Sequence, residues 1–290
     1  MKDKIEVKKE FKIEKVKTNV LLEEMSNRGF ISTHRELLID KTYKFPRRLK
    51  PFKIGVVSDT HIGSNCQQIT LLHEAYKMMR AKGVKKVLHA GDMVEGNGKL
   101  FRGQVYEMFL HGADAMINYA IKYYPKFNGM TTYVIGGSHD YSFYKEGGTD
   151  VLMKIAEERE DIKYLGMFGA FMKLGKILVY LMHGAGGVAY ARSYKMQKII
   201  EQIPPEKKPH ILLLGHYHVQ CHLPTYRNVA GFQLPCFQTQ TNYLMAKALF
   251  PEIGFLILTI TPNAKGIFKY DTEWFPFYVP VKDDYWSGRN

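Results

Sequence analysis

Five short apolar runs recur between residues 52 and 215, and polar or turn-forming residues separate them. The runs are FKIGVVS (52–58), VKKVLHA (84–90), TTYVIGG (131–137), KILVYLM (176–182) and HILLLG (210–215). Runs of this length, rich in Val, Ile and Leu, are typical of strands buried on both faces of a sheet. The pattern therefore predicts five core strands.

Amphipathic segments that predict helices lie between several of these runs, over residues 69–83, 105–124, 148–160 and 191–203. Gly83 and Pro204 fall where two of these helices should end. Strands that alternate with helices indicate an α/β core with parallel strands. Residues 254–261 and 266–279, joined by PNAK, predict an antiparallel hairpin that closes a second sheet.

Residues 1–50 follow a different pattern and predict a small basic extension ahead of a main domain over 51–290. The stretch FPRRLKPF (45–52) marks the boundary with two prolines and a group of basic residues. Residues 10–17 alternate like a strand, and 18–30 and 31–38 predict two short helices. A DNA-reading helix-turn-helix is one interpretation of this helix pair. Packing of two short helices for structural reasons is the other.

The composition is that of a soluble globular protein of 290 residues, with 46% hydrophobic and 24% charged residues. No stretch is apolar and long enough to span a bilayer, and the N-terminus lacks the apolar region of a signal peptide. The three cysteines are widely spaced and form no disulfide ladder, which fits a reducing compartment. We therefore expect a cytoplasmic protein without membrane contact.

The net charge of +13 is the strongest compositional signal. Residues 1–53 hold fifteen basic and eight acidic side chains, so 15 − 8 = +7 of this charge lies in the first fifth of the chain. A positive field favours polyanions such as nucleic acid. A charged, well-solvated surface with no specific partner is the alternative interpretation.

Each of the five apolar runs is followed at once by side chains suited to metal binding or proton transfer. In chain order these are Asp59 and His61, then Asp92, then Ser138, His139 and Asp140, then His183, then His216 and His218. Since ligands bind beyond the carboxyl ends of parallel strands, five such loops at the same end of one sheet should converge on one site.

The residue types indicate which metals would bind. Aspartate and histidine without cysteine suit Mn²⁺, Fe²⁺, Zn²⁺ or Ni²⁺ rather than Ca²⁺. The candidate ligands are too many for a single four-coordinate ion and suit two ions that share a carboxylate. Such a pair can hold a bridging hydroxide and clamp both oxygens of an in-line phosphoryl displacement.

The ordered motifs DTH, GD, GSHD, H and GHYH resemble those of the calcineurin-like metallophosphoesterase superfamily, from about Phe52 to the C-terminus. The resemblance implies a four-layer α/β/β/α sandwich with a dimetal site at one edge. The chain is also similar in general appearance to nuclease-like members, including the Mre11/SbcD exonucleases and the archaeal DNA polymerase small subunit. Such nucleases can dimerise, so the resemblance also leaves a homodimer open.

The resemblance further implies a role for each motif residue. The first metal would be held by Asp59, His61 and His218, Asp92 would bridge, and the second metal would be held by His183, His216 and position 138. His139 would be the general acid, and Asp140 would fix its tautomer.

Ser138 departs from the family pattern, because the family has asparagine at this position. A serine hydroxyl is shorter than an asparagine carbonyl and reaches a metal only through a water or a closer backbone. Either the second metal site is weakened or the enzyme is degraded. Because every other motif residue is present, we expect an active enzyme with a weakened second site.

These observations predict a metal-dependent hydrolase of phosphodiester bonds, with nucleic acid as substrate and manganese as the expected metal. Aromatic and basic residues interleave near the motifs, and Tyr141, Arg192 and Lys195 are the candidates for substrate binding, with packing in the core as their alternative. A phosphomonoesterase or nucleotide phosphatase is an alternative function. A non-catalytic subunit that binds nucleic acid is another.

Overall fold

The computed structural model describes residues 41–43, 50–263 and 266–285. The helix pair predicted for the N-terminal extension lies outside these residues, and the domain boundary at residue 50 stays a prediction. Nothing in these described ranges is a helix with the length and hydropathy needed to cross a bilayer.

The first of two six-stranded sheets has the order β12-β11-β2-β3-β4-β5. Its strands are β2 (Phe52–Val57), β3 (Lys86–His89), β4 (Thr131–Gly136), β5 (Ile162–Met167), β11 (Gly254–Asn263) and β12 (Gly266–Pro276). Strands β2 to β5 run parallel, whereas β11 pairs antiparallel with both β2 and β12. The predicted hairpin therefore exists, but it extends the sheet that contains β2 rather than closing a second one.

The second sheet has the order β1-β6-β7-β8-β10-β9. Its strands are β1 (Lys41–Tyr43), β6 (Gly169–Leu174), β7 (Ile177–Met182), β8 (Ile211–Leu214), β9 (Cys221–Tyr226) and β10 (Val229–Gln233). Strands β7, β8 and β10 run parallel to one another. The expectation that all five apolar runs share one sheet is thus wrong: three lie in the first sheet and two in the second.

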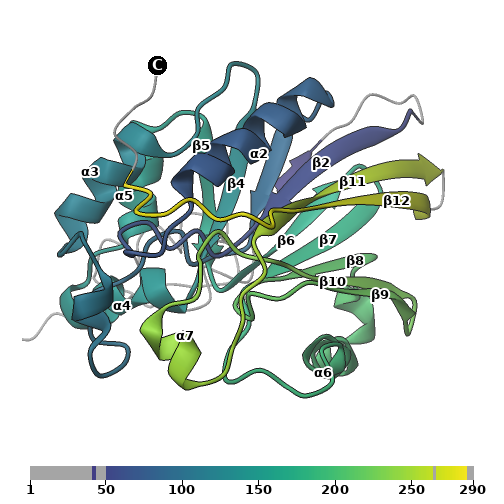
Figure 1. The fold of residues 1–290 in the computed structure, drawn as a ribbon. Coiled ribbons are helices and arrows are strands. Elements are labelled where there is room, and N and C mark those ends of the chain that lie inside the picture. The colour runs from purple at the N-terminus through teal and green to yellow at the C-terminus, as the bar shows by residue number, and fades with distance from the viewer. Residues whose placement is uncertain (1–40, 44–49, 264–265, 286–290) are drawn as a thin grey trace, which may run out of the picture. The chain divides into compact units, whose positions relative to one another are not determined.

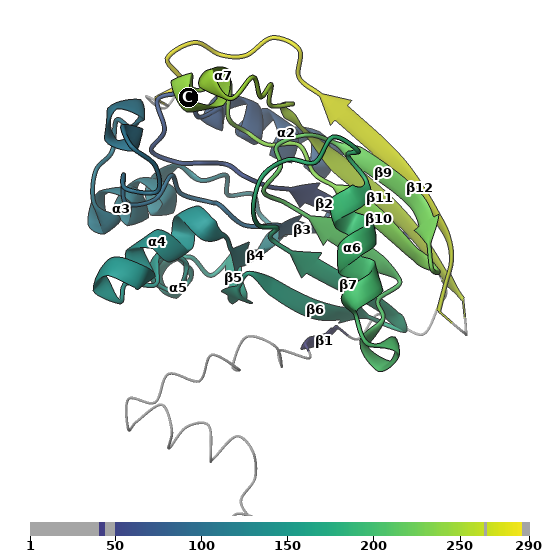
Figure 2. The same cartoon turned by 90° about the horizontal axis from the view of Figure 1, so that it is seen from below.

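Most helices pack on the outer faces of the two sheets, whereas the short helix Asn242–Ala246 buries no side chain against either (Figure 1). They are α2 (Ile69–Ala81), α3 (Ala113–Tyr123), α4 (Ser138–Gly147), α5 (Val151–Glu158), α6 (Tyr194–Gln202) and α7 (Asn242–Ala246), with single 3₁₀ turns η3 (Gln104–Glu107) and η4 (Pro205–Lys207). Helix α6 lies along the second sheet, on the side away from the first (Figure 2). Residues 105–112 of the predicted helix 105–124 form no α-helix.

Three apolar clusters join these layers, as an α/β/β/α sandwich requires. The first, which includes Leu72 and Ile155, lies between the first sheet and α2, α3 and α5. The second, which includes Leu256 and Leu213, fills the space between the two sheets. The third holds Met196 of α6 against the second sheet. The expected four-layer fold is confirmed.

Candidate metal centre

The predicted metal ligands lie together where strands of both sheets end. Six of them follow β2, β3, β7 or β8 within four residues: Asp59, His61, Asp92, His183, His216 and His218. Five of the six have φ angles in the left-handed region: Asp59 (52°), His61 (45°), Asp92 (52°), His216 (84°) and His218 (57°). Such backbone costs about 1–2 kcal/mol at a residue with a β-carbon. These loops are therefore shaped for the position of their side chains rather than for stability.

Glycines in two of the motifs let these loops approach one another closely. A β-carbon on Gly137 would overlap the side chain and backbone nitrogen of Asp92. One on Gly215 would overlap the Ser58 hydroxyl and the Ala90 carbonyl oxygen. A side chain at either position would push the loops apart.

Asp59, His61 and His218 form the first candidate ligand cluster, with one possible ligand atom from each within 4.8 Å of the others. The Nε2 atoms of His61 and His218 lie 3.0 Å apart. His218 Nε2 is 3.4 Å from Asp59 Oδ1. The His61 Nδ1–H donates to Glu95 Oε2 over 2.9 Å, which leaves the Nε2 lone pair facing the cluster.

Asp92, His183 and His216 form the second cluster. His183 Nε2 lies 3.0 Å from Asp92 Oδ2 and 3.2 Å from His216 Nδ1. The remaining nitrogen of each ring donates to a backbone carbonyl, that of Ala90 for His183 (2.8 Å) and that of Gly186 for His216 (3.0 Å). The other nitrogen of each ring, His183 Nε2 and His216 Nδ1, is thus held on the side of Asp92, where it could bind a metal once it carries no proton.

The two clusters are in direct contact. The His216 backbone N–H donates to both carboxylate oxygens of Asp59, at 3.1 and 3.0 Å. His61 and Asp92, one from each cluster, also group with His139 in a third set within 4.8 Å. The six candidate ligands therefore form one continuous centre.

Asp92 and the neighbouring histidines shift one another's pKa values. Burial raises the pKa of Asp92, but the neighbouring histidines, His183 foremost, together outweigh burial and hold the pKa well below its usual range. Burial lowers the pKa of His183, but Asp92, Asp59 and the Ala90 carbonyl together outweigh burial and raise the pKa to about 9. Burial and the His183 charge lower the pKa of His216 to about 4. A protonated His183 thus carries positive charge that a bound cation would replace.

Ser138 and His139 open helix α4 at the edge of the centre. The Ser138 hydroxyl donates to Asp92 Oδ2 over 3.3 Å, and the His139 backbone N–H donates to Asp92 Oδ1 over 2.8 Å. The His139 Nδ1–H donates to the Glu95 carbonyl oxygen over 2.6 Å. The structure places Ser138 beside the second cluster, while its role as a ligand stays a prediction.

Asp140 does not contact the His139 ring in the described part of the chain, so the expectation that it fixes the tautomer is wrong. Its buried carboxylate accepts three backbone N–H groups, from Gly137, Met93 and Val94, at 2.8 to 3.2 Å. Asp140 therefore ties the start of α4 to the loop that carries Asp92. The Glu95 carbonyl oxygen fixes the His139 tautomer instead.

Glu95 is a residue of the site that the sequence analysis missed. Its carboxylate is buried and accepts from His61 Nδ1, from Gln104 Nε2 (3.1 Å) and from Gln238 Nε2 (3.0 Å). Burial raises its pKa, but His61 and these hydrogen bonds outweigh burial and lower it. The sequence offers only a weak signal for it, an acidic residue three positions after Asp92, because its hydrogen-bond partners lie far away along the chain.

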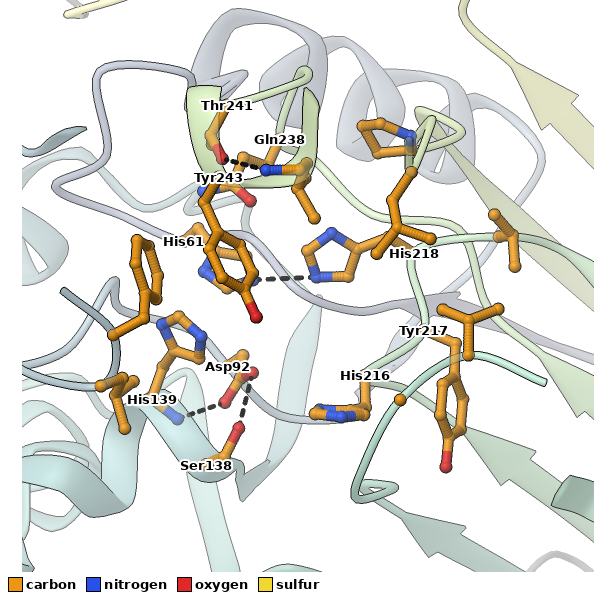
Figure 3. A pocket seen from close by; sticks show the side chains of 18 of the residues that line it. His61, Asp92, Ser138, His139, His216, Tyr217, His218, Gln238, Thr241 and Tyr243 are labelled. Atoms are coloured by element: carbon orange, nitrogen blue, oxygen red, sulfur yellow. Dashed lines mark hydrogen bonds between the residues drawn. The ribbon is translucent and has the colours of Figure 1, made fainter. Parts of the chain in front are cut away.

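A cavity of about 450 Å³ opens over the centre (Figure 3). Its polar wall includes His61, Asp92, Ser138, His139, His216 and His218, and its apolar wall includes Leu100, Phe101, Tyr243, Leu244, Leu249 and Phe250. The predicted ligands Asp59 and His183 are buried beneath this lining.

The three predicted substrate-binding residues are not among those that line the cavity. Tyr141 contacts the rings of Tyr144 and Phe168. The Arg192 guanidinium pairs with the Glu252 carboxylate over 2.7 Å. The Lys195 ammonium lies 5.9 Å from the ring centre of Tyr217. Substrate contact by these residues stays a prediction.

The two packed sheets and the joined His/Asp clusters define an α/β sandwich with a candidate two-metal centre. A family model described as the calcineurin-like phosphoesterase superfamily domain matches residues 52–231. The chain belongs to the calcineurin-like phosphoesterase superfamily. Among curated proteins, none matches this sequence.

Several solved structures are similar to the chain at low identity and low TM-score. A conserved uncharacterized protein from Streptococcus pneumoniae, described as a predicted phosphoesterase, is 13% identical over 79% of this chain and 99% of its own, with a TM-score of 0.38. Vps29 complexed with zinc, from Entamoeba histolytica, is 13% identical over 78% and 99%, with a TM-score of 0.39. The Thermus sulfate thiohydrolase SoxB is 9% identical over 81% and 58%, with a TM-score of 0.43. Likeness of this degree supports no functional conclusion.

Proposed function

We propose that the protein is a two-metal phosphodiesterase that acts on nucleic acid. The observation that carries this proposal is the junction of two three-residue His/Asp clusters, with His139 at their edge and a cavity above them. Family membership supports hydrolysis of phosphoester bonds in general. The choice of nucleic acid is a further step, which rests on charge.

The residues of the centre fit divalent cations. Two imidazole nitrogens 3.0 Å apart, His61 Nε2 and His218 Nε2, repel each other unless a proton or a cation lies between them. Asp59, His61 and His218 would hold one ion, His183 and His216 the other, and Asp92 would reach both. Two ions placed there supply Lewis-acid activation of the attacking water and of the phosphoryl group.

His139 would donate the proton that the leaving oxygen needs. Because its Nδ1–H is committed to the Glu95 carbonyl oxygen, only Nε2 can deliver a proton to the substrate. Glu95 Oε1 lies 3.9 Å from His139 Nδ1, so the ring is held between the carbonyl and the carboxylate of the same residue. The side chain is 18% exposed, so Nε2 is within reach of a bound ester.

Nucleic acid is favoured as substrate by the net charge of +13. A positive field raises the local concentration of a polyanion and speeds its association. The apolar wall of the cavity also offers aromatic rings, on which bases can stack. A resemblance to nuclease-like members agrees with this choice.

The test is Mn²⁺-dependent hydrolysis of one chromogenic phosphodiester and one chromogenic phosphomonoester, followed by single- and double-stranded DNA. We expect faster cleavage of the diester, and loss of that activity in His216→Ala together with lower Mn²⁺ stoichiometry. His111→Ala is the matched control, because this exposed histidine does not line the cavity. In His139→Ala, turnover should be lost while bound Mn²⁺ is retained.

Other outcomes would change the assignment. Preference for the monoester would make the protein a phosphatase. Stoichiometric Mn²⁺ without cleavage of either ester would indicate a binding protein, and DNA binding without hydrolysis would make it a non-catalytic subunit. Loss of Mn²⁺ in His139→Ala would contradict its role as the acid.

A further inference from the structure

Tyr243 lines the cavity, and its hydroxyl points toward the candidate metal centre (Figure 3). The hydroxyl of the other labelled tyrosine, Tyr217, donates to the Ala185 carbonyl oxygen instead. Tyr243 lies in the short helix α7 and is 37% exposed. Figure 3 shows its hydroxyl directed into the space that His139, Asp92 and His216 surround. The sequence analysis did not single out this residue.

The Tyr243 ring is fixed by contacts that leave its hydroxyl free. The ring stacks on Phe101, with centroids 4.0 Å apart and planes 21° apart. The Tyr243 backbone N–H donates to Glu107 Oε1 over 2.8 Å, which ties α7 to the turn η3. Within the described ranges no protein group hydrogen-bonds to the hydroxyl. A rigid phenol with an uncommitted O–H group therefore faces the candidate metals.

Few other donors in the cavity can contact a phosphoryl group. In the described part of the chain, no lysine or arginine lines the cavity. The Ser138 hydroxyl is directed at Asp92, and the Gln238 amide donates to Glu95 and Ser64. A phosphoryl group held at the metals would thus have an anionic oxygen facing the apolar wall, where Tyr243 supplies the donor.

We propose that Tyr243 is a catalytic residue whose hydroxyl donates a hydrogen bond to a phosphoryl oxygen of the substrate. Phe101 is a positioning residue, which acts by holding the phenol ring. This inference rests on the proposed function, because it assumes that a phosphoryl group occupies the metal centre. A hydrogen bond to a charged group strengthens as charge builds up on the phosphoryl oxygens in the transition state.

The test measures inorganic phosphate binding to the Mn²⁺-loaded full chain by calorimetry, alongside Mn²⁺ stoichiometry and diester hydrolysis. Tyr243→Phe removes only the hydroxyl and keeps the stack on Phe101. We expect its phosphate affinity to fall roughly tenfold or more, the usual effect of losing a hydrogen bond to a charged group, with Mn²⁺ stoichiometry unchanged. Phe101→Leu should weaken phosphate binding less. Tyr278→Phe, at an 88% exposed tyrosine outside the cavity, is the matched control and should match the wild type.

Phosphate affinity in Tyr243→Phe within twofold of the wild type would overturn the inference, as would a Mn²⁺-loaded wild type that binds no phosphate. The outcome for the proposed function is separate. If the wild type hydrolyses neither ester while Tyr243→Phe still loses phosphate affinity, the phosphodiesterase proposal fails and the Tyr243 contact stands.

Discussion

At the scale of single residues, the orientation of each histidine ring depends on the hydrogen bond that one of its two nitrogens donates. His61, His183, His216 and His139 each donate one ring N–H to a fixed acceptor, three of them to backbone carbonyls. A backbone carbonyl cannot change its protonation state or rotate away as a carboxylate can. The backbone therefore sets the orientation of His183, His216 and His139, whereas the orientation of His61 depends on the Glu95 carboxylate.

At Ser138, the difference from the family pattern predicts a substitution that should strengthen metal binding at the second cluster. In Ser138→Asn, the longer side chain brings a carbonyl oxygen toward the second cluster, and a neutral oxygen is a good ligand for Mn²⁺. We expect the Mn²⁺ concentration for half-maximal diester hydrolysis to fall about tenfold, for one added ligand worth roughly 1.4 kcal/mol. A metal titration of activity measures this. Ser138→Ala serves as control, and an unchanged requirement in Ser138→Asn would place residue 138 outside the second site.

At the scale of elements, the start of helix α4 is the most constrained part of the centre. Gly137 precedes the helix and touches Asp92, and Asp140 in the first turn binds the Asp92 loop through Met93 and Val94. The segment therefore joins β4 to the loop after β3 without room for another atom.

We expect Gly137→Ala to displace Asp92 and to weaken Mn²⁺ binding at least tenfold. The overlap should also lower the free energy of unfolding by about 1–3 kcal/mol, as overpacking of a close contact does. Gly147→Ala, in the last turn of the same helix, is the control, because no other group lies within 4 Å of its added β-carbon. Calorimetric Mn²⁺ titration and urea unfolding measure both effects. Equal Mn²⁺ affinity in the two variants would contradict this account.

How well the sequence predicts the structure differs from element to element. Runs 52–58 and 210–215 predict β2 and β8 because a short run of mostly apolar residues is typical of a buried strand. The sequence does not show that β2 and β8 belong to different sheets, since a strand that is apolar on both faces does not specify its neighbours. Helix α4 was missed because glycines and polar residues start it without an N-cap side chain. Strand β9 contains Pro224 and is half-buried, so it carries no clear period of two.

The candidate ligands were predictable because each stands at the end of a run, whereas Glu95 and Tyr243 were not. Glu95 acts through hydrogen bonds to His61 and Gln238, which lie far from it in the sequence. Tyr243 belongs to a short helix outside the alternating pattern. Its proximity to the centre depends on the stack with Phe101, which only the folded chain creates.

At the scale of the whole molecule, metal binding should be linked to protons. His183 has a pKa raised to about 9, so in the metal-free protein it is protonated at neutral pH. A cation needs the His183 Nε2 lone pair and must displace that proton. Lower pH therefore weakens binding, and higher pH strengthens it until the proton is gone.

We expect the Mn²⁺ affinity to rise about tenfold per pH unit between pH 7 and pH 8.5 for the proton that His183 releases, and this contribution to level off above about pH 9. Burial lowers the pKa of His218, but Cys236 and Asp59 outweigh burial and raise it, so a second released proton would make the rise steeper. Calorimetry at each pH in two buffers of different ionisation enthalpy gives both the affinity and the number of protons released. Affinity that stays constant over this range would mean that His183 is neutral before the metal arrives.

The division of the ligands between two sheets gives the packing between those sheets a second role. Residues after β2 and β3 must meet residues after β7 and β8 within the few tenths of an ångström that a coordination bond tolerates. A slip of one sheet by a single residue would move its ligands by about 3.3 Å, which is longer than the bond itself. The apolar layer between the sheets, which includes Leu213 and Leu256, thus keeps the candidate ligands at its edge in register. A substitution in this interior would consequently affect the candidate metal centre as well as stability, although none of these side chains belongs to the centre.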